Sequence, residues 1–315
     1  MTGPSELEVV VVGSANTDLV LEVPARPAPG ETVLATTASR SAGGKGLNQA
    51  VAAARDGART GFVGAVGDDA EGRLLADLLR TEGVDAHLLR ILPQRTGVAV
   101  VLVDPTGENS IVVAPGANAA LGPLTRDELA VIRSASVVLL QLETPLPTVL
   151  EAATAARAAG ARVVLNAAPA RRLPADLVAV VDLLLVNEDE ARAVGGHRQA
   201  ALGGLLASLV TLVPEVVVTL GAAGCRHASR TGVGHVVPAP RARTVDTTGA
   251  GDTFAGVLSA ALAGGLSMRG ALRRAVVAGA LSVERSGAVP SIPRRDEIAA
   301  RMPAPPAPTT GADQG

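Results

Sequence analysis

The chain has 315 residues, of which 48% are hydrophobic, and its formal net charge is −2. This supply of apolar residues allows one large domain or two smaller ones, and the charge balance excludes the basic surface that is typical of nucleic-acid-binding proteins. The single cysteine excludes an intramolecular disulfide and a thiolate metal cluster. With 1% aromatic residues, the chain has few rings on which a nucleoside substrate could stack. The histidines, which we expect at the surface or in loops, have no metal-ligand spacing: His87, His197, His227 and His235.

Membrane-spanning and targeting segments are not expected. The clearest apolar runs, Val9–Val12 and Val137–Leu140, have the length of strands and are too short to cross a bilayer. The N-terminus enters a strand-like run without the pattern of a signal peptide, so we expect a cytoplasmic protein. Residues 303–315 are rich in proline and predict a disordered tail, which leaves residues 1–302 as a single domain.

Valine-rich runs alternate with amphipathic segments of helical length along the chain, a pattern that is typical of βαβ units on a mainly parallel sheet. The sequence therefore predicts an α/β fold. Strands are expected at residues 8–12, 61–65, 137–142, 162–166, 182–186 and 215–220. Helices are expected at residues 47–56, 70–82, 145–159, 188–194, 199–212, 251–263 and 268–285.

Two stretches interrupt this alternation, at about residues 19–42 and 96–116. Each has a strand-like pattern with Pro-Gly or Asp-Pro-Thr-Gly turns and no helical periodicity. We expect them to pair as a small antiparallel sheet that projects from the α/β body. Such a β lid would cover a site or supply a contact between subunits, and we expect a homodimer through it.

Polar side chains follow several of the predicted strands. Asn16 and Asp18 follow the first strand, and Glu143, Asn166 and Asn187 follow three later ones. Because open α/β sheets bind ligands at the carboxyl ends of their strands, these residues predict one binding site at that edge.

The segment from Asp246 to Phe254, Asp-Thr-Thr-Gly-Ala-Gly-Asp-Thr-Phe, is the strongest indication of chemistry. Apolar residues recur with helical spacing from Phe254 onward, so Gly249-Ala-Gly251 opens a helix. The unpaired amides and the positive dipole at a helix start form an anion site. Asp252, in the first turn, suits a general base that takes a proton from a hydroxyl beside a phosphate. The alternative interpretation is that Asp252 only stabilises the start of the helix.

A second indication is Lys45, the only lysine in a chain with 28 Lys and Arg residues. It lies in the segment Gly43-Gly-Lys-Gly-Leu-Asn48, at a junction between strand-like and helical patterns. An ammonium is a compact point charge that suits a tight phosphate or hydroxyl site. The segment is not a Walker A motif, because Ser39 stands where that motif needs its first glycine and Gly46 follows the lysine.

A dinucleotide fingerprint is absent as well, since the first strand ends in Gly13-Ser-Ala-Asn16 without Gly-x-Gly-x-x-Gly. Thr219-Leu-Gly-Ala-Ala-Gly224 follows a predicted strand, and its glycines would let a nucleotide approach the backbone closely. A simple turn is the alternative interpretation of this segment.

Two segments together resemble the signatures of the ribokinase-like (PfkB) sugar kinases: Gly43-Gly-Lys-Gly-Leu-Asn-Gln-Ala50 and Asp246-Thr-Thr-Gly-Ala-Gly-Asp252. The resemblance spans residues 8–298. Five further segments are similar to the ribose-specific members of the family: Gly13-Ser-Ala-Asn-Thr-Asp18, Glu108-Asn-Ser-Ile111, Pro115-Gly-Ala-Asn-Ala-Ala120, Gln141-Leu-Glu143 and Asn166-Ala-Ala-Pro-Ala170. The resemblance implies a three-layer sandwich with a mainly parallel central sheet and a projecting β lid. It also implies a kinase that uses ATP and Mg²⁺ to phosphorylate the 5-hydroxyl of D-ribose.

Matched positions imply roles for individual residues. Asp252 would be the base, and the amides of Gly249, Ala250 and Gly251 would form the anion hole. The sugar would contact Asn16, Asp18, Gly44, Lys45, Asn48 and Glu143. The nucleotide, its phosphates and Mg²⁺ would lie against Asn187, Glu190, Thr219, Leu220, Gly221, Ala222, Ala223, Gly224 and Gly251. An activating K⁺ would be held by a loop that includes Asp246, Thr248, Ser282, Arg285, Gly287 and Ser291.

One position departs from the family. Val276 stands where related kinases often have His or Asn beside the adenine, which leaves the nucleotide preference open. The substrate could also be deoxyribose, fructose or a sugar acid, although the pocket segments offer a sugar acid only the cation of Lys45. A nucleoside kinase is disfavoured by the shortage of aromatic residues. A catalytically silent sugar-binding regulator is disfavoured because it would not need to keep Asp252, Lys45 and the anion hole together.

Overall fold

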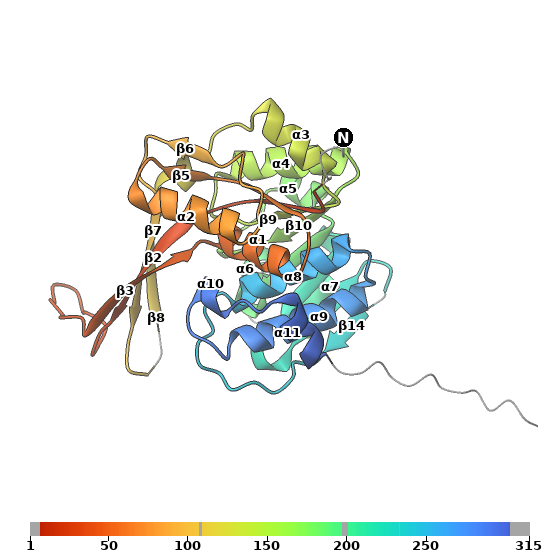
Figure 1. Ribbon diagram of the computed structural model, residues 1–315. Coiled ribbons are helices and arrows are strands. Elements are labelled where there is room, and N and C mark those ends of the chain that lie inside the picture. The colour runs from red at the N-terminus through yellow and green to blue at the C-terminus, as the bar shows by residue number, and fades with distance from the viewer. Residues whose placement is uncertain (1–6, 107–108, 197–200, 233, 303–315) are drawn as a thin grey trace, which may run out of the picture.

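The central element of the fold is an eight-stranded sheet, in the order β14-β13-β12-β11-β10-β9-β1-β4 (Figure 1). The structure is a computed structural model that describes residues 7–106, 109–196, 201–232 and 234–302. Strands β4, β1, β9, β10, β11 and β12 run parallel, and β13 and β14 extend the sheet as antiparallel strands. The strands are β1 Val9–Val12, β4 Thr60–Val63, β9 Val137–Leu140, β10 Arg162–Asn166, β11 Leu183–Asn187, β12 Glu215–Thr219, β13 Cys225–Ser229 and β14 Gly234–Val237.

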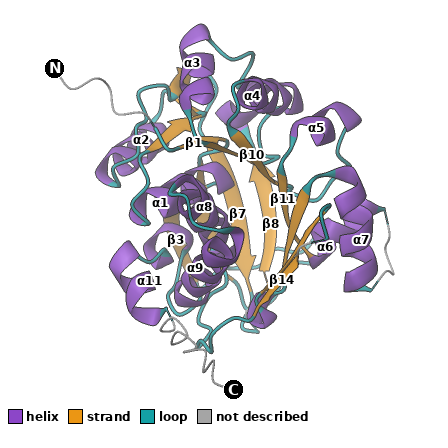
Figure 2. Cartoon of the chain, turned by 90° about the vertical axis from the view of Figure 1, so that its right-hand side faces the viewer, coloured by secondary structure: helices purple, strands orange, loops and turns teal. Residues whose placement is uncertain are grey.

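Helices cover both faces of this sheet (Figure 2). Alternate strand residues point into the two layers, and because both faces are buried the strands are continuous apolar runs. One layer contains α1 Lys45–Arg55, α2 Ala70–Thr81, α8 Ala250–Ala263, α9 Met268–Ser282, α10 Ala288–Ser291 and α11 Arg295–Arg301. The other contains α3 Arg126–Ser134, α4 Leu146–Ala158, α5 Ala175–Val180, α6 Glu188–Gly195 and α7 Leu202–Leu212. The expected three-layer α/β sandwich is confirmed.

The β lid is a separate four-stranded sheet in the order β3-β2-β7-β8, which projects from the body (Figure 1). Its strands are β2 Asn16–Glu22, β3 Thr37–Gly43, β7 Gly97–Val103 and β8 Asn109–Ala114. The expected antiparallel pairing holds within each hairpin, β2 with β3 and β7 with β8. It is wrong between the hairpins, because β2 and β7 both run outward from the body and pair in parallel, with Asn16 opposite Gly97.

Several element boundaries differ from the sequence-based expectation. The expected strand at 61–65 is two strands, β4 and β5 (Ala65–Gly67), on either side of Gly64, where an added Cβ would lie 2.7 Å from the carbonyl oxygen of Gly13. The expected helix at 268–285 ends at Ser282. Among the elements that were not expected are β5, β6 (Arg90–Leu92), β13, β14, α3, α5, α10, α11 and the 3-10 turns Gly116–Ala120 and Gly221–Ala223. The expected start of α7 at residues 199–200 and the tail at 303–315 lie outside the described residues.

The expectation that the histidines lie at the surface or in loops is wrong for His227. Residues alternate along β13, so that Cys225 and His227 point inward while Arg226 is exposed. The Nε2 atom of His227 lies 3.1 Å from Glu215 Oε2, and its ring stacks on that of His235 with centroids 5.3 Å apart. Across the part of the chain that the structure describes, no helix is long and apolar enough to cross a membrane.

Candidate active site

The site is centred on Asp252, near the start of α8 where this helix packs against α1. Its side chain is buried, and both carboxylate oxygens accept amide hydrogen bonds from α1. Oδ2 accepts from Asn48 Nδ2 at 3.0 Å, and Oδ1 accepts from Gln49 Nε2 at 2.9 Å. Each carboxylate oxygen has two lone-pair sites, so the two bonds fix the group without exhausting its capacity to accept a proton.

The first turn of α8, directly beside this carboxylate, presents backbone amides of the kind that suit an anion. Gly249 caps the helix with a φ of 73°, a left-handed conformation that favours glycine. Of the three amides expected in the anion hole, that of Ala250 donates to the carbonyl oxygen of Thr247 at 3.2 Å. No backbone acceptor within residues 7–106, 109–196, 201–232 and 234–302 engages the amides of Gly249 and Gly251. These free donors at the positive end of a 14-residue helix suit a phosphoryl group.

Lys45 and Glu143 meet at the start of α1. Gly44 precedes the helix with a φ of 93°, and an added Cβ there would lie 2.8 Å from the amide nitrogen of Asn16. The Lys45 amide and the Ser14 hydroxyl donate to Glu143 Oε2 at 3.1 and 2.5 Å. The glycine therefore lets the chain turn tightly enough to place Lys45 beside the carboxylate.

The charges around this point perturb one another. The negative charges of Asp252, Glu143 and Glu190 raise the pKa of Lys45 and outweigh its burial, so its ammonium stays charged. Burial, together with the charges of Glu143 and Asp252, raises the pKa of Asp18 to about 7. Near neutral pH, Asp18 is therefore partly protonated and can donate as well as accept a hydrogen bond.

Replacing Asp18 with asparagine is expected to stabilise the protein, increasingly so as the pH rises. The folded protein holds a proton up to about pH 7 that an ordinary carboxyl releases at 3.8, so the wild-type stability falls as pH rises between these values. Asparagine does not ionise, and each pKa unit corresponds to about 1.4 kcal/mol. Measured from pH 4 to pH 8, the Tm of Asp18→Asn should rise above that of the wild type by a difference that grows by a few degrees.

Asp69→Asn is a control with the opposite sign. Burial acts to raise the pKa of Asp69, but hydrogen bonds from Thr96 and Gly72 outweigh it and lower the pKa. The ionised Asp69 carboxylate therefore stabilises the fold at pH values above the ordinary pKa of an aspartate, and this stabilisation is lost as the pH falls. Relative to wild type, Asp69→Asn should be least stable near neutral pH. Parallel pH profiles for the two variants would contradict the assignment for Asp18.

The side-chain amides of Asn118 and Asn48 are both buried. Asn118 Nδ2 donates to Asn16 Oδ1 at 2.7 Å. Asn118 also accepts from the Ala15 amide and donates to the Ala15 carbonyl, and these bonds together fix the Asn16 side chain. Asn48 Oδ1 is buried and has no partner among the described residues. Because buried polar atoms are rarely left without a partner, this oxygen suits a hydroxyl of a ligand.

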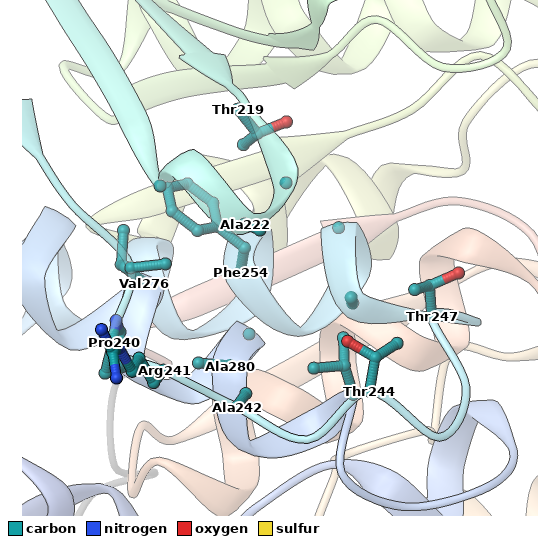
Figure 3. Close-up of a pocket in the computed structure, with 17 residues that line it drawn as sticks. Thr219, Ala222, Pro240, Arg241, Ala242, Thr244, Thr247, Phe254, Val276 and Ala280 are labelled. Atoms are coloured by element: carbon teal, nitrogen blue, oxygen red, sulfur yellow. The ribbon is translucent and has the colours of Figure 1, made fainter.

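A cavity of about 530 Å³ lies on the other side of the α8 start (Figure 3). Of the expected nucleotide segment, Thr219, Gly221, Ala222 and Gly224 line it, together with Gly251. Leu220 packs into the helical layer that contains α7, and Ala223 is exposed. Apolar side chains of Phe254, Val276 and Ala280 form another wall. A loop that was not predicted, residues 239–244, also lines the cavity.

Asn187 and Glu190 form the cap of α6 and do not line this cavity. Asn187 Oδ1 accepts from the Glu190 amide at 2.8 Å, and Glu190 Oε2 accepts from the Asn187 amide at 2.8 Å. Burial, with the charges of Asp252 and Asp189, raises the pKa of Glu190 against the opposing effects of Asn187 and Lys45. The cap therefore holds the Glu190 carboxylate where it interacts with both Lys45 and Asp252.

The residues expected around K⁺ lie on two segments, one before α8 and one from the end of α9 to α10, which the bond between Gly287 and Asp246 connects. Asp246 accepts from the amides of Thr248 at 2.8 Å and Gly287 at 2.7 Å, and these bonds outweigh burial and lower its pKa. The hydroxyls of Ser282 and Ser291 donate to carbonyl oxygens of their own helices, which leaves their lone pairs free. Arg285 pairs with Glu297. No group of three or more His, Cys, Asp or Glu residues gathers to hold a metal in the described ranges.

Comparison with known proteins assigns this arrangement to a family. The profile of the pfkB family carbohydrate kinases matches residues 6–295. The chain belongs to this family. This pfkB-family chain is 39% identical over 295 residues to the ribokinase of Haemophilus influenzae, covering 92% of this chain and 96% of that one.

Two solved structures are similar to this pfkB-family chain. Arabidopsis thaliana ribokinase complexed with ribose and ATP has a TM-score of 0.88 and 36% identity, covering 94% of this chain and 98% of that one. Ribokinase from Thermotoga maritima has a TM-score of 0.86 and 33% identity, covering 94% and 99%. The expected resemblance to the family is confirmed.

Sequence reasoning missed three parts of the site: Gln49, Asn118 and the loop at 239–244. Gln49 and Asn118 lie inside segments that carry the resemblance. Asn118 is a polar residue among small apolar ones, which is a weak signal, whereas Gln49 follows the polar Asn48 and has no signal of its own. The loop at 239–244 has no such signal in the sequence, because its contact with the cavity depends on the path of the chain between β14 and α8.

Proposed function

We propose that the protein transfers the γ-phosphoryl group of ATP to the 5-hydroxyl of D-ribose, giving D-ribose 5-phosphate and ADP. The observation that carries this proposal is the position of Asp252, fixed by Asn48 and Gln49 at the start of α8 and adjoining the 530 Å³ cavity. The ribokinase relatives, one of them complexed with ribose and ATP, support ribose over other sugars.

In this mechanism ribose lies on the lid side of α8 and ATP on the cavity side. The sugar hydroxyls bind to Asn16, Asp18, Lys45, Asn48 and Glu143. Of these, Asn48 offers an acceptor, Oδ1, that has no donor among the described residues. Asp252 removes the proton of the 5-hydroxyl as its oxygen attacks the γ-phosphorus, and ADP leaves. The free amides of α8 neutralise the charge that develops on the phosphoryl oxygens.

Two cations fit the residues present. Mg²⁺ would supply charge neutralisation between the ATP phosphates. Asn187 and Glu190 would hold it or its water ligands, since carboxylate and amide oxygens are ligands that Mg²⁺ prefers. K⁺ would supply a fixed positive charge beside the α8 start. Asp246, Thr248, Ser282, Gly287 and Ser291 offer oxygen atoms for it, and Arg285 contributes through its backbone because its side chain pairs with Glu297.

The lid supplies the contact between two subunits in our proposal. Its edge strand β8 exposes Ile111, Val112 and Val113 at 55%, 70% and 43%. An apolar edge strand with unpaired backbone groups favours pairing with a second chain. Light scattering should report a dimer, and a strictly monomeric protein would remove this part of the proposal.

The function is tested by ADP release from purified protein with Mg²⁺-ATP and a panel of ribose, deoxyribose, fructose, sugar acids and adenosine, each with Na⁺ or K⁺. Ribose should give the highest kcat/KM, and K⁺ should increase it. Preference for another sugar would change the substrate assignment but not the proposed mechanism. No turnover on any sugar would favour a silent binding protein.

A parallel series with GTP in place of ATP should show weak discrimination between the two nucleotides, because Val276 can pack against a base but cannot hydrogen-bond it.

A further inference from the structure

A chain of three buried amides contacts Asp252 through Gln49. Gln49 on α1 is fully buried, and its Nε2 donates to Asp252 Oδ1 at 2.9 Å and to Asn166 Oδ1 at 3.0 Å. Its Oε1 accepts from Gln141 Nε2 at 2.6 Å. The three amides come from α1, from the end of β10 and from the segment after β9, so distant parts of the sequence converge on Gln49, which alone of the three bonds Asp252 Oδ1.

The orientation of these amides follows from the chemistry of their partners. An ionised carboxylate only accepts hydrogen bonds, so Gln49 must turn its NH₂ group toward Asp252. Its oxygen then faces Gln141, which must donate. Asn166 presents its oxygen to Gln49 because its own Nδ2 donates to the carbonyl of Leu185 at 3.2 Å. The charge of Asp252 therefore orients Gln49, and the carbonyl of Leu185 orients Asn166, whereas Gln141 Oε1 is buried without a partner among the described residues.

We propose that Gln49 is a positioning residue for Asp252, which anchors Oδ1 to the core and leaves Oδ2 as the oxygen that takes the substrate proton. Oδ2 accepts from Asn48, a residue that binds the sugar in the proposed function, whereas Oδ1 accepts from the fully buried Gln49. This inference rests on the proposed kinase function and on the base role of Asp252. Gln49 itself touches neither substrate.

The test compares Gln49→Met with Gln49→Glu, two side chains of similar length. Methionine removes the donor, and glutamate replaces it with an acceptor that repels the carboxylate. Loss of position should lower kcat by up to about a hundredfold in each variant, with KM for the sugar retained. Hydrogen bonds to a charged form favour that form, so the acid limb of the kcat profile should move to higher pH, further for glutamate than for methionine.

Other charged groups also face Asp252, and their ionisation contributes to the pH dependence of kcat. They are Lys45 on α1, Asp18 on β2, Glu143 after β9 and Glu190 on α6. Gln49→Met adds no charge beside them and gives the cleaner profile, whereas Gln49→Glu adds a negative charge to the group. Gln141→Met should move the profile in the same direction by less, because it removes only the partner that orients Gln49. Gln94→Met, at an exposed glutamine, is the matched control and should be unchanged.

The outcomes separate this inference from the proposed function. Wild-type protein without turnover on any sugar would overturn the function itself. Wild-type turnover with an unmoved pH profile in folded Gln49→Met and Gln49→Glu would overturn the positioning role. If a variant fails to fold, as judged by its circular dichroism and Tm, the Gln141→Met profile decides: an unmoved profile there contradicts the proposal.

Discussion

Replacing Asp252 with asparagine is expected to lower kcat by about 10²–10⁴-fold, the usual contribution of a general base. Asparagine keeps the size of the side chain but cannot remove the proton of a sugar hydroxyl. It also presents one NH₂ group to either Asn48 or Gln49, both of which already donate at 3.0 and 2.9 Å. One of the two hydrogen bonds must therefore be lost. Steady-state ADP release measures kcat, and calorimetric titration measures sugar binding, which should be largely retained.

Asp127→Asn is the matched control for the alternative interpretation of Asp252. Asp127 also lies in the first turn of a helix, α3, where it interacts with the helix dipole and is remote from the cavity. If Asp252 merely stabilised the start of α8, the two variants would lose similar stability and keep their turnover. Near-wild-type kcat in Asp252→Asn would remove the base assignment.

Parts of the site whose geometry is local could be predicted from the sequence. The first turn of a helix follows from glycine, an acidic residue and apolar periodicity, and α8 does begin at Ala250 with Gly249 as its cap. Polar residues at strand ends could be assigned to one edge because parallel strands align their carboxyl ends. In the structure Glu143 and Asn166 each accept from a residue of α1, Lys45 and Gln49, and Asn16 accepts from Asn118.

Contacts that join distant segments could not be predicted in the same way. The hydrogen bond between Gln49 and Asp252 connects residues 203 positions apart, and no local pattern encodes that distance. The parallel pairing of β2 with β7 likewise depends on how two hairpins leave the body, which their own alternation does not show. The Asn187-Glu190 element illustrates a different limit. Its spacing is a capping box whatever its function, so the sequence alone leaves both interpretations possible.

The position of Asp252 depends on how closely α8 approaches α1, and Gly256 sets that approach. An added Cβ at Gly256 would lie 2.3 Å from the carbonyl oxygen of Gln49 and 2.6 Å from the Cβ of Ala52. The first contact is with backbone, so a side-chain rotation cannot relieve it, and the helices must separate. Asp252 lies one turn away on the same helix and bonds the neighbouring residues of α1, so it moves with α8.

Gly256→Ala is therefore expected to affect stability and catalysis together. Overpacking of this kind costs about 1–3 kcal/mol, and a displacement of the base on the order of 1 Å can lower kcat by about 10²-fold. Gly203→Ala on α7 is the matched control, since nothing lies within 4 Å of its added Cβ, and it should be neutral or stabilising by about 0.5–1 kcal/mol. Thermal unfolding and ADP release measure the two effects. A Gly256→Ala protein that loses stability but keeps wild-type kcat would show that the base is held by its amide partners alone, because α8 could then shift without moving the carboxylate.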